Sequence, residues 1–223
     1  KYAKKFDKSF INESNILIPH DIRSMYKDKI DPKVLNAFKT SIRNITHFHK
    51  KQFPKGFKIS RNGAKINSVW KPINSVGLYI PGGNAVYPSS LIMNVIPAKV
   101  AGVKRIVLVT PSKCNKINPY ILALIDELKI EETYQIGGAQ AIAALAYGTK
   151  SIKAVDKIFG PGNAYVASAK KQVFGDVGID LIAGPSEIVV VADSKNNPKW
   201  VASDLIAQAE HDEKAQSILI TDS

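Results

Sequence analysis

A glutamine and a histidine near the end of the chain could together reach one metal ion. Gln208 and His211 lie in a segment that we expect to be helical, and residues three apart on a helix project from the same face. Imidazole is a good zinc ligand and a carboxamide oxygen a weak one, while zinc sites usually have four ligands. The pair alone therefore predicts at most half of a zinc site. An exposed helix end is the alternative interpretation.

Glycine-rich turns are the second group of residues that could do chemistry. The usual dinucleotide pattern Gly-x-Gly-x-x-Gly begins at Gly160-Pro-Gly162, but Tyr165 stands where its third glycine belongs. Glycines after strands allow close approach of the backbone to a ligand, and a following helix offers free N–H groups to phosphate. The turns indicate either a nonstandard nucleotide site or simple chain reversal.

Neither the serine nor the cysteine candidate is expected to be a nucleophile. Ser186, in Gly184-Pro-Ser-Glu187, has no histidine near it in the sequence that could act as its base, so we interpret it as a hydrogen-bonding group. Cys114 lies in a loop without a histidine partner. His47 and His49 are interpreted as a solvated helix end.

The N-terminal part of the chain is expected to contain helices followed by a β-hairpin. The first 55 or so residues are expected to be helical, with Asp31 as a cap and Pro32 in the first helical position. The alternation of apolar and polar residues over Phe57 to Trp70, around Asn62-Gly63, predicts a β-hairpin.

From Val76 onward, strand-like and helix-like segments alternate. Such alternation predicts an α/β, Rossmann-like fold with a mostly parallel sheet and flanking helices. The expected strands are Val76–Ile80, Arg105–Thr110, Thr133–Ile136, Lys157–Phe159, a buried Ile188–Ala192, and Ser217–Thr221. Five helices are expected. Their starts are a cap at Ser89 or Ser90, Asn118-Pro119, Ala139, the residue after Asn163, and Lys199. The last of these helices is expected to end at His211. We expect residues 1–75 to form a helical segment plus hairpin and 76–223 a nucleotide-binding region.

In this fold the glycine-rich turns lie at one edge of the sheet, because right-handed crossovers bring the carboxyl ends of all parallel strands to that edge. We therefore expect six glycines to line one cleft at that edge. They are Gly82, Gly83, Gly137, Gly138, Gly160 and Gly162.

Composition narrows the function classes. The net charge is +12, but Arg23, Arg43, Arg61 and Arg105 are the only arginines, and the lysines are scattered. Nucleic-acid sites favour arginine and basic patches interleaved with aromatic residues, so we do not expect nucleic-acid binding. The apolar runs are strand-sized, so no membrane span is expected. A single cysteine fits a reducing cytoplasm.

Five segments, in this order and approximate spacing, resemble the histidinol dehydrogenase family, and the resemblance runs over nearly the whole chain. They are Tyr79-Ile-Pro-Gly-Gly83, Gly137-Gly-Ala-Gln-Ala-Ile-Ala-Ala-Leu-Ala146, Lys157-Ile-Phe-Gly-Pro-Gly-Asn163, Ala183-Gly-Pro-Ser-Glu187 and Asp204-Leu-Ile-Ala-Gln-Ala-Glu-His211. Because the chain starts at Lys1 and stops after a strand-like segment, we expect a fragment that lacks the extreme N-terminus and the C-terminal half.

The resemblance implies an NAD-dependent, four-electron oxidation of L-histidinol through L-histidinaldehyde to L-histidine. It implies that Tyr79, Gln140 and Asn163 contact NAD, although a core tyrosine and two helix-capping amides are the plain interpretations of these residues. It further implies that Ser186 contacts histidinol. Gln208 and His211 would bind both substrate and zinc, together with an Asp and a His from further along, and the zinc would position the substrate.

The same resemblance places the acid–base Glu-His pair of the family after Ser223, so we expect no catalytic residue in this chain and no activity from it alone. It also implies a cytoplasmic homodimer. Two alternatives stay open: a noncatalytic nucleotide-binding remnant of the same family, and a basic RNA-associated protein.

Overall fold

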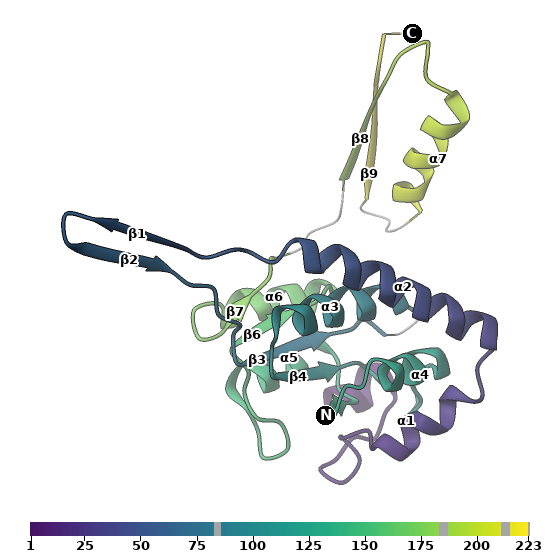
Figure 1. Cartoon of the computed structure of the whole chain (residues 1–223). Coiled ribbons are helices and arrows are strands. Elements are labelled where there is room, and N and C mark those ends of the chain that lie inside the picture. Colours follow the sequence, from purple (N-terminus) through teal and green to yellow (C-terminus); the bar gives the residue numbers. More distant parts are fainter. Residues whose placement is uncertain (83–85, 183–186, 211–214, 223) are drawn as a thin grey trace. The chain divides into compact units, whose positions relative to one another are not determined.

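A computed structural model (Figure 1) describes residues 1–82, 86–182, 187–210 and 215–222. The chain divides into two compact units, Lys1–Ile182 and Ala183–Ser223, and each is described by itself. The predictions for Gly83, Ser186 and His211 concern residues outside the described ranges.

The first unit contains a five-stranded parallel sheet in the order β5-β4-β3-β6-β7. The strands are β3 (Ser75–Tyr79), β4 (Arg105–Val109), β5 (Glu132–Tyr134), β6 (Lys157–Phe159) and β7 (Gly178–Ile179). The first strand of this sheet, β3, lies in its centre. The chain then adds β4 and β5 on one side of β3, and β6 and β7 on the other side. This is the strand order of a Rossmann fold, with its topological switch point between β3 and β6. The Rossmann-like prediction is confirmed, although the two-residue strand β7 was missed.

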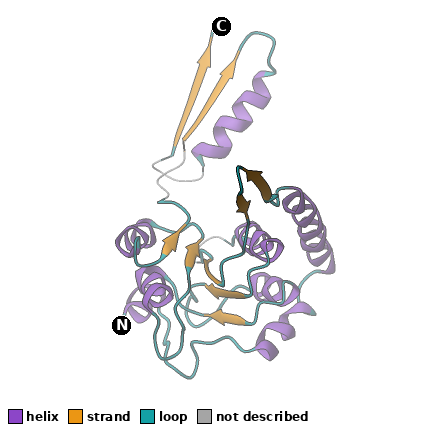
Figure 2. Cartoon of the chain, turned by 60° about the vertical axis from the view of Figure 1, so that its left-hand side comes forward, coloured by secondary structure: helices purple, strands orange, loops and turns teal. Residues whose placement is uncertain are grey.

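Helices cover both faces of this sheet, as Figure 2 shows. They are α3 (Pro88–Ala101), α4 (Pro119–Glu127), α5 (Gly138–Tyr147) and α6 (Ala164–Val173). Because side chains alternate along a strand, Leu78 and Leu108 pack with α3 and α4, while Tyr79 and Val107 pack with α5 and α6. Leu78, Leu108 and Val107 are fully buried, and each such side chain stabilises the fold by about 1.5–3 kcal/mol.

Two of the predicted helix starts show how capping signals succeed or fail. Asn118 caps α4 by accepting a hydrogen bond from the N–H of Tyr120 at 2.9 Å, as predicted. The predicted cap of α3 at Ser89 or Ser90 is wrong, because the helix begins at Pro88 with Tyr87 as its N-cap. A proline in the first turn lacks an N–H that would need a partner, so the start of α3 does not require a serine.

The N-terminal part packs around the sheet as a mixture of helices and loops. A π-helical turn η1 (Ala3–Asp7) is followed by α1 (His20–Lys27) and α2 (Pro32–Lys51). Residues between η1 and α1 are not helical, so the prediction of a mostly helical first 55 residues is only partly correct. The buried Ser9 hydroxyl holds this stretch to the sheet by donating to the carbonyl oxygen of Ser112 at 2.8 Å.

The predicted hairpin is confirmed as β1 (Phe57–Arg61) and β2 (Ala64–Ser68), paired antiparallel. Asn62 and Gly63 form its turn with φ of 49° and 78°. Two successive residues with positive φ give the turn geometry that matches strand twist, which is why Asn-Gly is favoured there.

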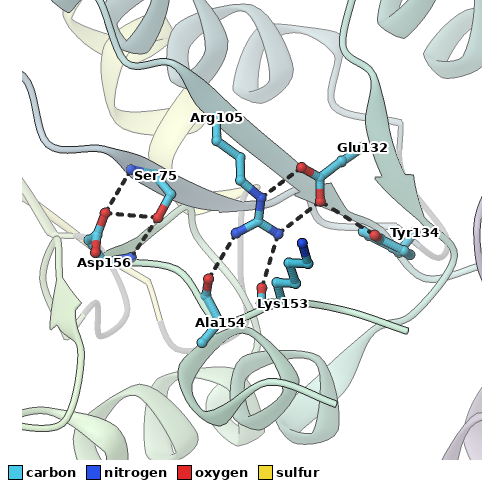
Figure 3. A network of polar contacts seen from close by, with 7 residues as sticks. All are labelled: Ser75, Arg105, Glu132, Tyr134, Lys153, Ala154 and Asp156. Carbon is cyan, nitrogen blue, oxygen red and sulfur yellow. Dashed lines mark hydrogen bonds and ion pairs between the residues drawn. The ribbon is translucent and has the colours of Figure 1, made fainter. Parts of the chain in front are cut away.

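At the amino edge of the sheet, opposite the glycine turns, polar side chains connect the start of β4 to that of β5, and the start of β3 to the residue before β6 (Figure 3). Arg105 donates two hydrogen bonds to the Glu132 carboxylate, at 2.7 and 2.8 Å, and others to the carbonyl oxygens of Lys153 and Ala154. The Asp156 carboxylate accepts from both the N–H and the hydroxyl of Ser75. These bonds fix the register of the strands from the end remote from the turns.

The second unit contains β8 (Glu187–Ala192), α7 (Pro198–Ala209) and β9 (Gln216–Thr221), and its two strands pair in parallel. The prediction of β8 as a buried strand is wrong. Val189 and Val191 are 53% and 74% exposed, whereas the alternate residues are partly covered. A strand with helix α7 on one face shows this alternation, which the continuous apolar run Ile188–Ala192 hides in the sequence.

Candidate functional site

The candidate site is built on three turns that follow β3, β5 and β6. Because all pairs in the sheet are parallel, these turns lie at the same carboxyl edge, as predicted for Gly82, Gly137, Gly138, Gly160 and Gly162. The wider prediction that these glycines line one cleft stays a prediction. Crevices for ligands in such sheets lie at this edge, outside the switch point.

Tyr79 connects two of these turns. Its ring is only 4% exposed and belongs to the core beneath α5 and α6. Its hydroxyl accepts a hydrogen bond from the N–H of Gly138 at 3.1 Å. Burial raises the pKa of Tyr79, the Gly138 bond opposes this rise, and the negative charge of Asp7 adds to it. The phenol therefore stays neutral near neutral pH and orients the first turn of α5.

Gly160 lies directly against Tyr79. Its φ is +114°, and a Cβ at this position would lie 2.0 Å from the carbonyl oxygen of Tyr79. No other residue type fits so close an approach in that conformation. The turns after β3 and β6 are therefore in backbone contact at the switch point.

Pro111, two residues after β4, lies against both of the turns that follow β3 and β5. A Cβ on Gly82 would lie 2.9 Å from Pro111, and a Cβ on Gly137 would lie 2.4 Å from it. Pro111 therefore leaves no room for a side chain at Gly82 or at Gly137. The glycines here are required by packing of the turns against one another.

The two amide residues predicted to contact NAD are both at helix starts. Asn163 is exposed and caps α6, and its side-chain oxygen accepts from the N–H groups of Tyr165 and Val166 at 3.1 Å. Gln140 is half-buried in the first turn of α5, and its amide lies close to Gly138. The capping interpretation is correct for Asn163. Both hydrogen bonds go to the oxygen of its amide.

The donor set at this edge suits a dinucleotide. The start of α6 follows two glycines and so favours an anion, although the N–H groups of Tyr165 and Val166 in its first turn already donate to the Asn163 side chain. The Asn163 amide group adds a donor at the same helix start. These features fit NAD by the chemistry of their donors.

The predicted zinc residues lie in the second unit. Gln208 is half-buried in the last turn of α7, which ends at Ala209 with Glu210 as its C-cap. The helix therefore ends two residues before the predicted end at His211, which lies outside the described residues, as does Ser186. Within the described ranges no group of three or more His, Cys, Asp or Glu side chains could hold a metal. The described donors do not by themselves make a zinc site.

Two further groups lie outside the turns described above. His20 lies 3.3 Å from Asp126, and Cys114, in the loop after β4, is exposed with φ of 52° and donates its N–H to the carbonyl oxygen of Asp7 at 2.9 Å. Asp7 was not predicted as a site residue; burial raises its pKa, and it is close enough for its charge to act on Tyr79. Nothing in the spacing of Asp7 could have indicated this, because Asp7 and Tyr79 are 72 positions apart in the sequence.

Among the helices that the structure describes, none is both long and apolar enough to cross a membrane.

Comparison with known proteins gives a consistent result. The family model for histidinol dehydrogenase matches residues 1–223. The chain is 50% identical to histidinol dehydrogenase of Rhodospirillum rubrum over 222 residues, covering 99% of this chain and 51% of that protein. It is 52% identical to that of Mesorhizobium japonicum over 223 residues, covering 99% and 52%.

A solved structure agrees with these relatives. The crystal structure of histidinol dehydrogenase from Elizabethkingia anophelis matches with a TM-score of 0.94 at 40% identity, over 100% of this chain and 52% of that one. The chain spans about half the length of the curated relatives it matches. With the family model matching from end to end and half the residues identical in full-length relatives, the chain belongs to the histidinol dehydrogenase family.

Proposed function

We propose that this chain provides the nucleotide-binding part of an enzyme that oxidises L-histidinol through L-histidinaldehyde to L-histidine with NAD. The observation that carries the proposal is the switch point between β3 and β6, where Gly160 touches Tyr79 and Tyr79 binds Gly138. NAD, when bound, accepts hydride; the residues of this chain bind and orient it.

In this proposal, the amide group of Asn163 and the Gly160–Asn163 turn bind the phosphates, since both lie at the carboxyl edge and at the start of α6. Tyr79 keeps the β3 and β5 turns together through its bond to Gly138, and the family resemblance also assigns it a contact with the nucleotide. Gln140, one turn into α5, contacts the same ligand from the side of Gly138.

The substrate side is proposed from the family resemblance. Ser186, Gln208 and His211 contact histidinol, and Gln208 and His211 hold zinc with two ligands from outside this chain. An imidazole and an amide are compatible with zinc but supply only two of four ligands. We likewise propose a cytoplasmic homodimer, and a division of the chain into residues 1–75 and 76–223.

The nucleotide proposal is tested by binding of NADH to the 223-residue chain, measured by fluorescence. N163D keeps the oxygen that caps α6 but replaces the amide donor by a negative charge next to the phosphates. We expect NADH to bind at least about tenfold more weakly, equivalent to about 1.4 kcal/mol. N118D is the matched control, because Asn118 caps α4 in the same way, and its affinity should stay within about twofold, under about 0.5 kcal/mol.

Equal weakening by both substitutions, or no binding of NADH to the unsubstituted chain, would contradict the proposal. The alternative of a noncatalytic nucleotide-binding module is separated by activity. A module of that kind would bind NADH in the same way but give no turnover of histidinol when the chain is part of a full-length protein.

A further inference from the structure

A buried lysine in α6 and an aspartate after β7 together bind the peptide groups of Gly160. The Lys170 side chain is 4% exposed, and its Nζ donates to the carbonyl oxygen of Gly160 at 2.7 Å. The same Nζ forms an ion pair with Oδ1 of Asp180 at 2.5 Å. The other carboxylate oxygen, Oδ2, accepts from the N–H of Gly160 at 2.8 Å.

This arrangement encloses a single residue of the backbone. One member of the ion pair binds the C=O of Gly160 and the other binds its N–H. Asp180 is itself fixed, since its N–H donates to the carbonyl oxygen of Ile158 in β6 at 3.1 Å. Gly160 has a φ of +114°, so its peptide groups are rotated away from the pattern of an extended strand, and the ion pair provides partners for them.

A buried ion pair is a costly way to hold a turn. Taking two charges out of water costs several kcal/mol per ion, and only good geometry with further hydrogen bonds compensates for this cost. Here the side chain of Asp180 is still 20% exposed, while Lys170 is almost completely enclosed. Lys170 therefore cannot reach a bound ligand, so its effect on a ligand must pass through the turn that it holds.

The turn in question is the one at the switch point. It runs from Gly160 to Asn163, which caps α6, and Lys170 lies seven residues further along that same helix. The ion pair thus fixes the first residue of the turn relative to the helix that begins at its last residue. Gly160 is also the residue in backbone contact with Tyr79.

We infer that Lys170 and Asp180 are a positioning pair, which holds the Gly160–Asn163 turn in the shape that binds the phosphates of a dinucleotide. The inference rests on the proposed function for the identity of the ligand. It assigns no contact with the ligand to either residue. Removing Lys170 leaves the Asp180 charge without its partner and the Gly160 carbonyl oxygen without its donor, so the turn relaxes.

The test compares four substitutions in the 223-residue chain, with NADH as the probe. K170M should weaken NADH binding about tenfold, because the relaxed turn must then be ordered when the ligand binds. K170R keeps the positive charge and should restore part of the affinity. D180N, which keeps the shape of the side chain without its charge, should weaken binding by several-fold. K171M removes the same charge from the neighbouring, exposed position of α6 and should leave the affinity unchanged.

A second readout follows the turn directly. Amide hydrogen exchange at Gly160 and Gly162 should become faster in K170M and D180N, while exchange in β3 and β4 stays as in the unsubstituted chain. A purely structural contribution would instead change exchange throughout the sheet. If K170M does not fold, K170R and D180N carry both measurements.

The outcomes separate this inference from the proposed function. Unchanged NADH affinity in K170M or D180N, with the protein folded, would overturn the positioning role. If the unsubstituted chain does not bind NADH, the proposed function fails, and exchange alone decides the inference. Faster exchange confined to the turn then supports the pair as its positioning device, and unchanged exchange at Gly160 overturns it.

Discussion

Tyr79 and Gly138 lie 59 positions apart in the sequence, and the hydroxyl of the first accepts a hydrogen bond from the N–H of the second at 3.1 Å. The bond joins the end of β3 to the first turn of α5, across the carboxyl edge of the sheet. Because the Tyr79 ring is 4% exposed, the residue is part of the core and of the candidate site at once. Its hydroxyl thus connects the packing of the sheet to the geometry of the turn.

Replacing this tyrosine by phenylalanine removes only the hydroxyl. We expect Y79F to lower the free energy of unfolding by about 1–3 kcal/mol, because the Gly138 N–H loses its buried partner. NADH affinity should fall as well, since the first turn of α5 is no longer held. Urea denaturation and NADH fluorescence measure the two effects.

Y147F is the matched control for Y79F. The Tyr147 hydroxyl also has one partner, Asp176 at 2.8 Å, but this tyrosine is 60% exposed. Its substitution should change stability by less than about 0.5 kcal/mol. Equal losses in the two variants would mean that the Gly138 bond has no particular importance.

The close approach of Gly160 to Tyr79 can be separated from its backbone conformation. Gly175 has nearly the same φ, +108°, but a Cβ there would meet nothing within 4 Å. G175A should therefore cost only the conformational strain, about 1–3 kcal/mol. G160A should cost about 1–3 kcal/mol more, because its Cβ must displace a backbone carbonyl. Equal thermal stability of the two variants would show that the turn can move away.

The sequence was sufficient for the order of elements and the edge on which the turns lie. Turn and cap signals such as Asn62-Gly63 and Asn118-Pro119 act locally, so they could be interpreted without the fold. The alternation of strands and helices then required a parallel sheet, and that sheet required a common edge. The strand β7 was missed because two residues carry no periodicity.

What could not be predicted depends on contacts between distant residues. Lys170 is one of two adjacent lysines in α6, and nothing local shows that it is the one buried beside Asp180. Similarly, the sequence offered core packing and ligand contact as alternatives for Tyr79, whereas the structure gives it a buried ring with a bonded hydroxyl at the edge. Its contact with NAD stays a prediction.

The amino edge of the sheet provides a pH-dependent prediction. Hydrogen bonds from Arg105 lower the pKa of Glu132 in the folded protein. A carboxylate whose pKa is lowered by folding stabilises the protein above its unfolded pKa, about 4.3, and this contribution is lost as the pH falls through the folded value. E132Q should therefore lower stability at pH 7 and flatten its decline below about pH 4.3.

Stability curves from pH 2.5 to pH 7, about the range in which carboxylates titrate, measure this effect. E13Q is the control, because Glu13 is exposed, and it should leave the curve unchanged. A curve for E132Q that runs parallel to that of the unsubstituted chain would show that the Arg105 bonds do not act through the charge of Glu132.

The proposed metal ligands provide a prediction for a full-length protein that contains this chain. H211N should reduce zinc affinity by at least about 10–100-fold and abolish turnover, because one of four ligands is lost and the substrate loses its anchor. H47N is the control, since His47 is exposed on α2. Metal analysis after dialysis decides the matter: stoichiometric, tightly bound zinc in active H211N would mean that His211 is a surface residue.

Expressed as it stands, the 223-residue chain should bind NADH but show no histidinol-dependent formation of NADH. Oxidation needs a base that takes the alcohol proton and later activates water, and such catalysis typically contributes about 10²–10⁴-fold. We propose that this base lies outside the chain and that the chain supplies two of the four zinc ligands. Poor positioning of the substrate can cost on the order of 10²-fold more, so the two losses together put turnover below detection.

The assay is absorbance of NADH with and without histidinol, at saturating zinc. Clear turnover would mean that a base within residues 1–223 does the chemistry, and the assignment of roles proposed above would be wrong.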